Sequence, residues 1–133
     1  MIEEPKAKKI NYVGAPAIFA LELACQQIND AFGDYGCYLV GSCLERPDWR
    51  DVDVRYIMKD EAFEALFPSA NINPATWEQD PRWLLLITSI SSWLRSATGL
   101  PVDFQIQTQT HANERHKGNR SALGMRIAKR TDR

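Results

Sequence analysis

The sequence predicts an α/β (α+β) fold in which a small mixed β-sheet is covered by helices. Two kinds of pattern alternate along the chain: short apolar runs with alternating polarity, typical of strands, and longer runs with apolar residues at helical spacing. The strand patterns fall at 36–40, 52–58 and 102–107. With 133 residues, the chain has the length of one domain built around a single core.

The first half of the chain predicts one helix followed by two strands. After a charged segment, Pro16 stands where a helix begins and Gly33 stands where it ends. The apolar residues between them recur at helical spacing: Ile18, Leu21, Cys25, Ile28 and Phe32. The run 36–40 predicts a strand, and the spacer 43–50 predicts a loop or a broken helical turn before the strand that starts near Val52.

The second half predicts two helices and a further strand. Asp60 is expected to cap a short helix, and 69–79 is expected to form a surface loop. Asp80 followed by proline predicts the start of a long helix. The apolar stripe of that helix comprises Trp83, Leu86, Ile87, Ile90, Trp93, Leu94 and Ala97. We expect the tryptophans of this stripe to lie in the core rather than to stack on a nucleobase.

Composition and charge divide the chain into three parts. Hydrophobic residues make up 44% and charged residues 25%, as in ordinary globular proteins. The net charge is −6 over 1–110 and +5 over 111–133. We predict a flexible segment over 1–13, a domain over 14–110 and a basic tail over 111–133. Such a tail is most often a solvated end, and it can also contact a triphosphate or an RNA backbone.

Other features exclude several classes of protein. No apolar run is long enough to span a bilayer and the start lacks a secretory pattern, so we expect a cytoplasmic protein without a membrane partner. The odd set of Cys25, Cys37 and Cys43 has no metal-ligand spacing, which predicts buried, reduced thiols. His111 and His116 do not match the spacing of a metal-binding helix and are expected at the surface.

Three aspartates carry the chemistry that the sequence predicts. Because successive side chains of a strand alternate between its faces, Asp51 and Asp53 share one face. Two like charges held close repel each other, so a fold keeps them only with a compensating cation or for some other reason, and a divalent metal is the obvious candidate. Asp103 joins them if its strand is a neighbour. Mg²⁺ prefers oxygen ligands and shares them with substrate phosphates, so this cluster predicts a metal and nucleotide site.

In combination, these segments resemble the nucleotidyltransferases of the DNA polymerase β type, including the minimal nucleotidyltransferases. The resemblance covers roughly 36–107: an apolar strand ending in Gly41 and Ser42, a spacer, an Asp-x-Asp strand, and a later strand with a third acid. It implies a nucleotidyltransferase-like fold and a Mg²⁺-dependent enzyme. It also implies that the three aspartates carry the catalysis and hold one or two Mg²⁺ ions.

The resemblance also assigns roles around the metal. Gly41 allows close approach of the backbone, and Ser42 meets the terminal phosphates of the nucleotide. Asp103 holds a second metal or takes the proton from an acceptor hydroxyl. Arg50 and Arg55 are candidates for contact with phosphate. Because Arg55 shares the face of the Asp-x-Asp pair, pairing with a carboxylate is its commoner role.

The predicted reaction moves a nucleoside monophosphate from an NTP to a hydroxyl and releases pyrophosphate. The acceptor can be a protein, an RNA or a small molecule. One alternative is pyrophosphoryl transfer to a nucleotide, since 102–108 is similar to the Gln-Ile-x-Thr strand of alarmone synthetases. Another is an inactive domain that binds a nucleotide or a partner. Larger relatives close over the base with a second domain, so a homodimer or a partner protein could complete the pocket here.

Overall fold

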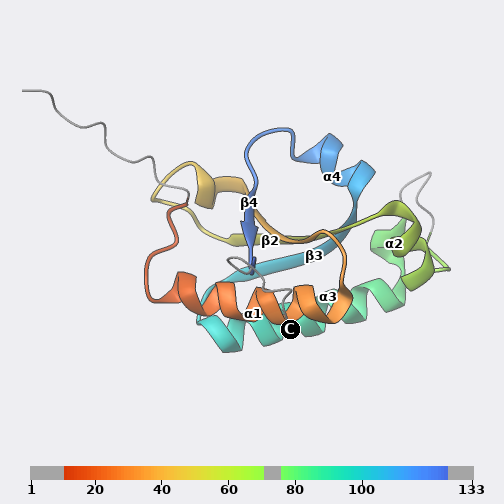
Figure 1. Ribbon diagram of the computed structural model, residues 1–133, viewed down its shortest axis with the longest axis horizontal. Helices are drawn as coiled ribbons and strands as arrows, with labels where there is room; N and C mark the ends of the chain where they lie inside the picture. The colour runs from red at the N-terminus through yellow and green to blue at the C-terminus, as the bar shows by residue number, and fades with distance from the viewer. Residues whose placement is uncertain (1–10, 71–75, 126–133) are drawn as a thin grey trace, which may run out of the picture.

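The computed structural model describes residues 11–70 and 76–125, and helices and strands are mixed along the chain (Figure 1). The elements are α1 (Ala17–Phe32), β1 (Gly36–Val40), η1 (Gly41–Leu44), β2 (Val52–Met58), α2 (Asp60–Leu66), η2 (Trp77–Gln79), α3 (Pro81–Thr98), β3 (Val102–Thr108), α4 (Gln109–Arg115) and β4 (Ser121–Leu123). The two η elements are short 3₁₀-helices. The predicted class, a small mixed sheet with helices packed on it, is confirmed.

The four strands form one sheet in the order β3-β2-β1-β4. β1 is antiparallel to both β2 and β4, whereas β2 and β3 are parallel. Parallel neighbours need a long crossover connection, and the segment that contains α2 and α3 supplies it. This crossover brings β3, which is distant along the chain, against β2.

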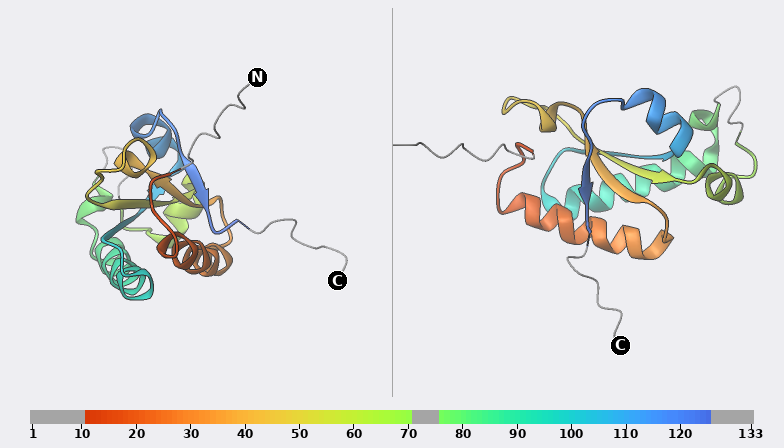
Figure 2. Two further views of the ribbon diagram at one scale, coloured as in Figure 1. Left: turned by 90° about the vertical axis from the view of Figure 1, so that its left-hand side faces the viewer. Right: turned by 45° about the horizontal axis from the view of Figure 1, so that its top comes forward.

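Helices cover the two faces of the sheet unequally. α1 and α3 run side by side in opposite directions and cover one face (Figure 1). α4 lies on the other side of the sheet, as the end-on view of α1 and α3 shows (Figure 2). The side chains of Leu39, Val54 and Phe104 are fully buried in the core on the α1 and α3 side. The opposite face is left largely to polar side chains.

Local sequence signals set the ends of the long helices. The Asp80 carboxylate accepts hydrogen bonds from the backbone N–H groups of Arg82 and Trp83, so the predicted cap of α3 is confirmed. Gly33 and Gly99 end α1 and α3 in the left-handed conformation. Asp60 does not cap α2. Its carboxylate instead accepts hydrogen bonds from the backbone and hydroxyl of Thr110, which ties α2 to α4.

Two predictions about tryptophans are wrong. Trp77, expected in a surface loop, is buried and packs edge-on against Phe63; residues 71–75 of that loop lie outside the described residues. Trp83 is buried as expected, and its indole N–H donates to the carbonyl oxygen of Ile106. Trp93 is 40% exposed, because α3 packs on the sheet through a stripe too narrow to include it.

The boundaries of the predicted domain also need correction. Val13, placed in the flexible segment 1–13, is buried in the core, and residues 1–10 lie outside the described residues. The predicted tail 111–133 begins inside α4 and contains β4, which pairs with β1. A three-residue strand is too short to give a clear alternating pattern. Residues 126–133 lie outside the described residues.

Two further findings concern the cysteine residues and membrane-spanning helices. The cysteines Cys25, Cys37 and Cys43 are buried and free, as predicted. Among the described residues, no helix combines the length and the apolar character that crossing a membrane would require.

Candidate active site

Asp53 and Asp103 lie side by side on neighbouring parallel strands. Asp53 of β2 is the register partner of Asp103 of β3, and adjacent strands are about 4.8 Å apart. Val52 and Val54, which alternate with Asp53, are fully buried in the core. Both aspartates therefore project from the sheet face opposite α1 and α3.

Asp51 completes an acidic group at the start of β2. It is exposed and immediately precedes the strand. The pKa of Asp53 is raised, first by burial and then by the negative charges of Asp103 and Asp51, while the Arg55 guanidinium opposes the rise. The pKa of the Cys43 thiol is raised to about 11 by burial and by the charges of Asp53 and Asp51. The three carboxylates thus share one electrostatic environment.

Gly41 lies directly against this group. Its neighbour Val40 is the register partner of Asp53 in the antiparallel pair of β1 and β2. Gly41 has φ of +81°, and a Cβ atom there would lie 2.5 Å from Oδ2 of Asp53. Glycine is therefore required both by the backbone conformation and by the space. Ser42 follows in η1 and is partly buried.

Arg55 is the cation that the acids hold in this structure. Its side chain is 10% exposed, and Nη2 lies 3.4 Å from Oδ2 of Asp103 and 4.0 Å from Oδ1 of Asp53. Nη1 donates hydrogen bonds to the backbone carbonyls of Val54 and Asp103. Nε is buried and has no hydrogen-bond partner among the described residues. The prediction that Arg55 pairs with a carboxylate is confirmed, and contact with phosphate stays a prediction.

The donor set suits a hard divalent cation. Asp51, Asp53 and Asp103 offer only carboxylate oxygens, which Mg²⁺ prefers. A cation would also relieve the charge repulsion that helps raise the pKa of Asp53. Within 11–70 and 76–125, no three His, Cys, Asp or Glu side chains are already gathered as a metal centre, and Asp53 and Asp103 face Arg55 instead.

The other predicted phosphate ligand, Arg50, and the nearby Arg46 are both at the surface. Arg50 is exposed and immediately precedes Asp51. Arg46 forms a surface ion pair with Asp48, 3.4 Å long, in which both side chains are mostly exposed. Neither arginine is held rigidly by such surroundings, so binding of nucleotide by Arg50 stays a prediction.

A row of polar side chains along β3 was not predicted from the sequence. Gln105 and Gln107 share the face of Asp103, since they alternate along one strand. Gln107 is buried; its amide N–H lies 3.5 Å from the Gln105 carbonyl oxygen, and its own carbonyl oxygen lies 3.2 Å from Nε2 of His116. A glutamine at every second position, Gln-x-Gln after the third acid, was the available signal for this row.

Both histidines are less exposed than predicted. His111 packs edge-on against Trp77, with ring centroids 4.6 Å apart. The pKa of His111 is lowered by burial and by the charge of Arg115. The pKa of His116 is lowered by burial and then by the charge of Arg55. The segment after β3 therefore folds over the same face of the sheet that carries the acids.

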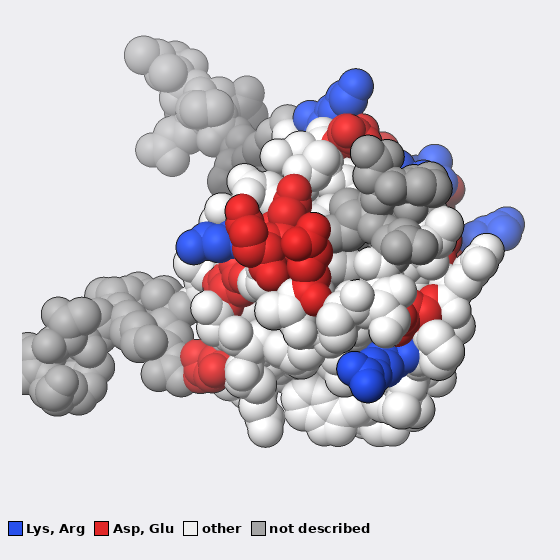
Figure 3. Space-filling model, turned by 90° about the vertical axis from the view of Figure 1, so that its right-hand side faces the viewer, with Lys and Arg blue, Asp and Glu red and all other residues white. Residues whose placement is uncertain are grey.

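A second acidic patch lies elsewhere. Asp and Glu side chains gather on the side of the molecule that carries α2 (Figure 3), whose sequence includes Asp60, Glu61 and Glu64. Asp51 and Asp53 stand at the start of β2, whereas α2 follows its end. The seven residues of β2 rise by about 3.3 Å each, so the two acidic groups are some 20 Å apart.

Comparison of the chain with models of protein families, with curated proteins and with solved structures found no match. The case for a function therefore depends on the residues and geometry described above.

Proposed function

We propose that this protein is a Mg²⁺-dependent nucleotidyltransferase that moves a nucleoside monophosphate from an NTP to a hydroxyl acceptor. The observation that carries the proposal is the register of β2 and β3, which sets Asp53 beside Asp103. Asp51 precedes Asp53, and Gly41 lies against its carboxylate. Paired carboxylates beside a glycine turn are suited to hold metal-bound triphosphate.

Each residue has a role in this proposal. Asp51, Asp53 and Asp103 hold one or two Mg²⁺ ions, which neutralise negative charge on the triphosphate when bound. Gly41 lets the backbone lie close to the Asp53 carboxylate, and Ser42 offers its hydroxyl to the phosphate oxygens. Asp103 accepts the proton of the attacking hydroxyl, a role that its half-exposed side chain permits.

Arg55 serves the acids rather than the triphosphate directly. Its guanidinium contacts both Asp53 and Asp103, so it holds two like charges on adjacent strands at close range. Its bonds to the carbonyls of Val54 and Asp103 fix the guanidinium to the sheet itself. We expect it to orient the carboxylates before a metal arrives.

The test is transfer of label from ATP to an acceptor. The purified protein is incubated with Mg²⁺ and a cell extract, in parallel with ATP labelled at the α or the γ position. Label that reaches a macromolecule or metabolite from the α position alone supports the proposal. The double variant Asp53→Asn/Asp103→Asn should abolish transfer, and Asp48→Asn, exposed at the surface, is the matched control.

Two outcomes contradict the proposal. Transfer of both the γ and β phosphates to a nucleotide, without the α phosphate, indicates pyrophosphoryl transfer. Binding of MgATP by calorimetry that is unchanged in the double variant removes the acids from the site.

A further inference from the structure

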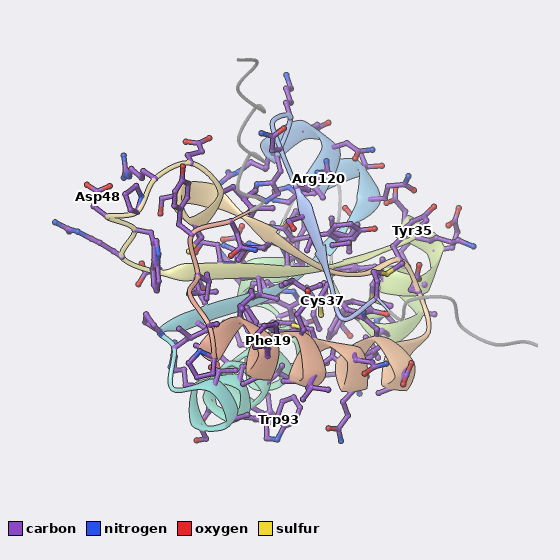
Figure 4. The ribbon with its side chains drawn as sticks, turned by 60° about the vertical axis from the view of Figure 1, so that its left-hand side comes forward. Phe19, Tyr35, Cys37, Asp48, Trp93 and Arg120 are labelled. Atoms are coloured by element: carbon purple, nitrogen blue, oxygen red, sulfur yellow. The ribbon has the colours of Figure 1, made fainter. Side chains whose placement is uncertain are left out.

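The outer surface of the helix layer is unusually apolar. α1 and α3 lie side by side and antiparallel, with their inner faces on the sheet (Figure 1). On their outer sides Leu23 is 69% exposed, Leu85 is 70% exposed, and Phe19 is 64% exposed. Phe19 and Trp93 both project from this layer, and Trp93 lies at the side away from the sheet (Figure 4). Large apolar side chains exposed together on one layer are typical of interaction sites.

This surface also has few charges. The exposed residues of α3 between 84 and 97 are Leu84, Leu85, Thr88, Ser89, Ser92, Trp93, Arg95, Ser96 and Ala97. One of these nine is charged, Arg95, and its Nε donates to the carbonyl oxygen of Val102. Arg82, in the first turn of α3, is also exposed. The exposed residues of α1 are Phe19, Leu23, Gln27, Asp30 and Ala31. Loss of charge together with exposed aromatic side chains is typical of the centre of a protein interface.

The pattern on α3 is self-complementary. Leu85, Ser89 and Trp93 are spaced by four residues, so they form one ridge along the helix. Along this ridge a large side chain is followed by a small one and then by another large one, so the order of sizes is the same from either end of the helix. A two-fold axis near Ser89 would place Leu85 of one copy against Trp93 of a second copy. The serine at the crossing point allows two helices to approach within about 8–10 Å.

A second copy of this chain fits the surface better than a charged partner. A face with so few charges does not repel its own copy and offers nothing to attract an oppositely charged protein. The 18 residues of α3 and the 16 of α1 give helices about 27 and 24 Å long. Side by side, the two helices cover a flat area of roughly 500 Å². This area is of the same order as a standard interface, in which each partner buries about 800 Å² of accessible surface.

We infer that the chain forms a two-fold dimer through the outer faces of α1 and α3. The candidate active site lies on the opposite face of the sheet, so it stays open in each copy. This inference does not depend on the proposed function.

Sedimentation velocity over a wide range of micromolar concentrations tests the dimer. The wild-type chain should sediment at roughly twice its mass of 15.1 kDa. Leu85→Glu should raise the dimer dissociation constant at least about tenfold, because it places a charge in the interface. Met125→Glu, a change at a similarly exposed apolar residue that belongs to neither helix, should leave the constant unchanged. Circular dichroism checks that each variant is folded.

Mixing two variants tests the register of the interface. Leu85→Glu and Trp93→Lys should each weaken the homodimer, while an equal mixture should recover a heterodimer in which the new charges meet. A wild-type chain that sediments at its single mass at every concentration overturns the inference. The inference is also overturned if Leu85→Glu and Trp93→Lys are folded and dimerise as the wild type does.

Discussion

Asp53 is the residue on which the candidate site depends most. It is paired with Asp103 across the strands, contacts Arg55 and touches the Gly41 turn. Its raised pKa shows that the folded chain disfavours the charged form. A purely structural role gives no reason for a carboxylate at this position, because an uncharged side chain would avoid the cost of burying a negative charge beside other carboxylates.

Asp53→Asn is therefore expected to stabilise the metal-free protein at neutral pH. A carboxyl whose pKa is raised by folding favours the folded state most below its unfolded pKa near 4. That contribution is lost as pH rises through the folded value. The gain in melting temperature from Asp53→Asn should thus be present at pH 7, should shrink as the pH falls toward about 4, and should be absent below it.

Thermal denaturation at several pH values, with Asp48→Asn as the exposed control, measures this effect. A lower melting temperature for Asp53→Asn at pH 7 would contradict the assigned direction of the pKa shift.

Gly41→Ala tests the contact between the turn and the acid. The new Cβ would collide with Oδ2 of Asp53, and the backbone has φ of +81°. The substitution should lower the free energy of unfolding by about 1–3 kcal/mol and should weaken binding of MgATP. Gly118→Ala, where a Cβ meets open space, is the matched control. Equal stability of the two variants in urea denaturation would show that Gly41 is not so confined.

Arg55→Met tests whether the guanidinium holds the acids together. Removal of the charge leaves two neighbouring carboxylates unpaired, so the free energy of unfolding should fall by about 2 kcal/mol. Mg²⁺ should then raise the melting temperature more than it does in the wild type, because it replaces the missing cation. If Arg55→Met is as stable as the wild type and Mg²⁺ raises its melting temperature no further than that of the wild type, then Arg55 and a metal ion do not occupy the same site between the acids.

At the scale of elements, the sequence allowed accurate prediction where the signals are local. Asp80, Gly33 and Gly99 act on adjacent backbone, and the short apolar runs of β1, β2 and β3 mark strands that are mostly buried. The pairing of β2 with β3 rested on a resemblance, since no local signal fixes which strands are neighbours. The burial of Trp77 and the exposure of Trp93 depend on how distant elements pack, which periodicity does not reveal.

The pairing of β4 with β1 also depends on contacts between distant parts of the chain, and it leads to a prediction about Gly124. A Cβ at Gly124 would collide with the backbone of α1 at Cys25 and Gln26, and its φ is +74°. Gly124→Ala should therefore destabilise the protein by at least about 2 kcal/mol. Urea denaturation compares it with Gly118→Ala. Unchanged stability would mean that β4 and Gly124 are not held against α1, which would agree with the predicted tail over 111–133.

At the scale of the whole molecule, the fold separates its surfaces by task. The sheet face with the acids is opposite the helix layer with the apolar surface. A separate acidic patch lies on the side of α2 (Figure 3). Of these two acidic groups in the described part of the chain, the one around Asp53 includes the glycine turn and acids on neighbouring strands.

Paramagnetic broadening by Mn²⁺ in NMR spectra tests the central claim most directly, because Mn²⁺ takes the same oxygen ligands as Mg²⁺. At the lowest additions, the amide signals of Gly41, Asp53 and Asp103 should broaden together, and Asp53→Asn/Asp103→Asn should abolish the effect. Glu61→Gln/Glu64→Gln on α2 should leave it unchanged. Broadening that begins at α2, or that reaches Asp53 without Asp103, would contradict a single cation site formed by the two strands.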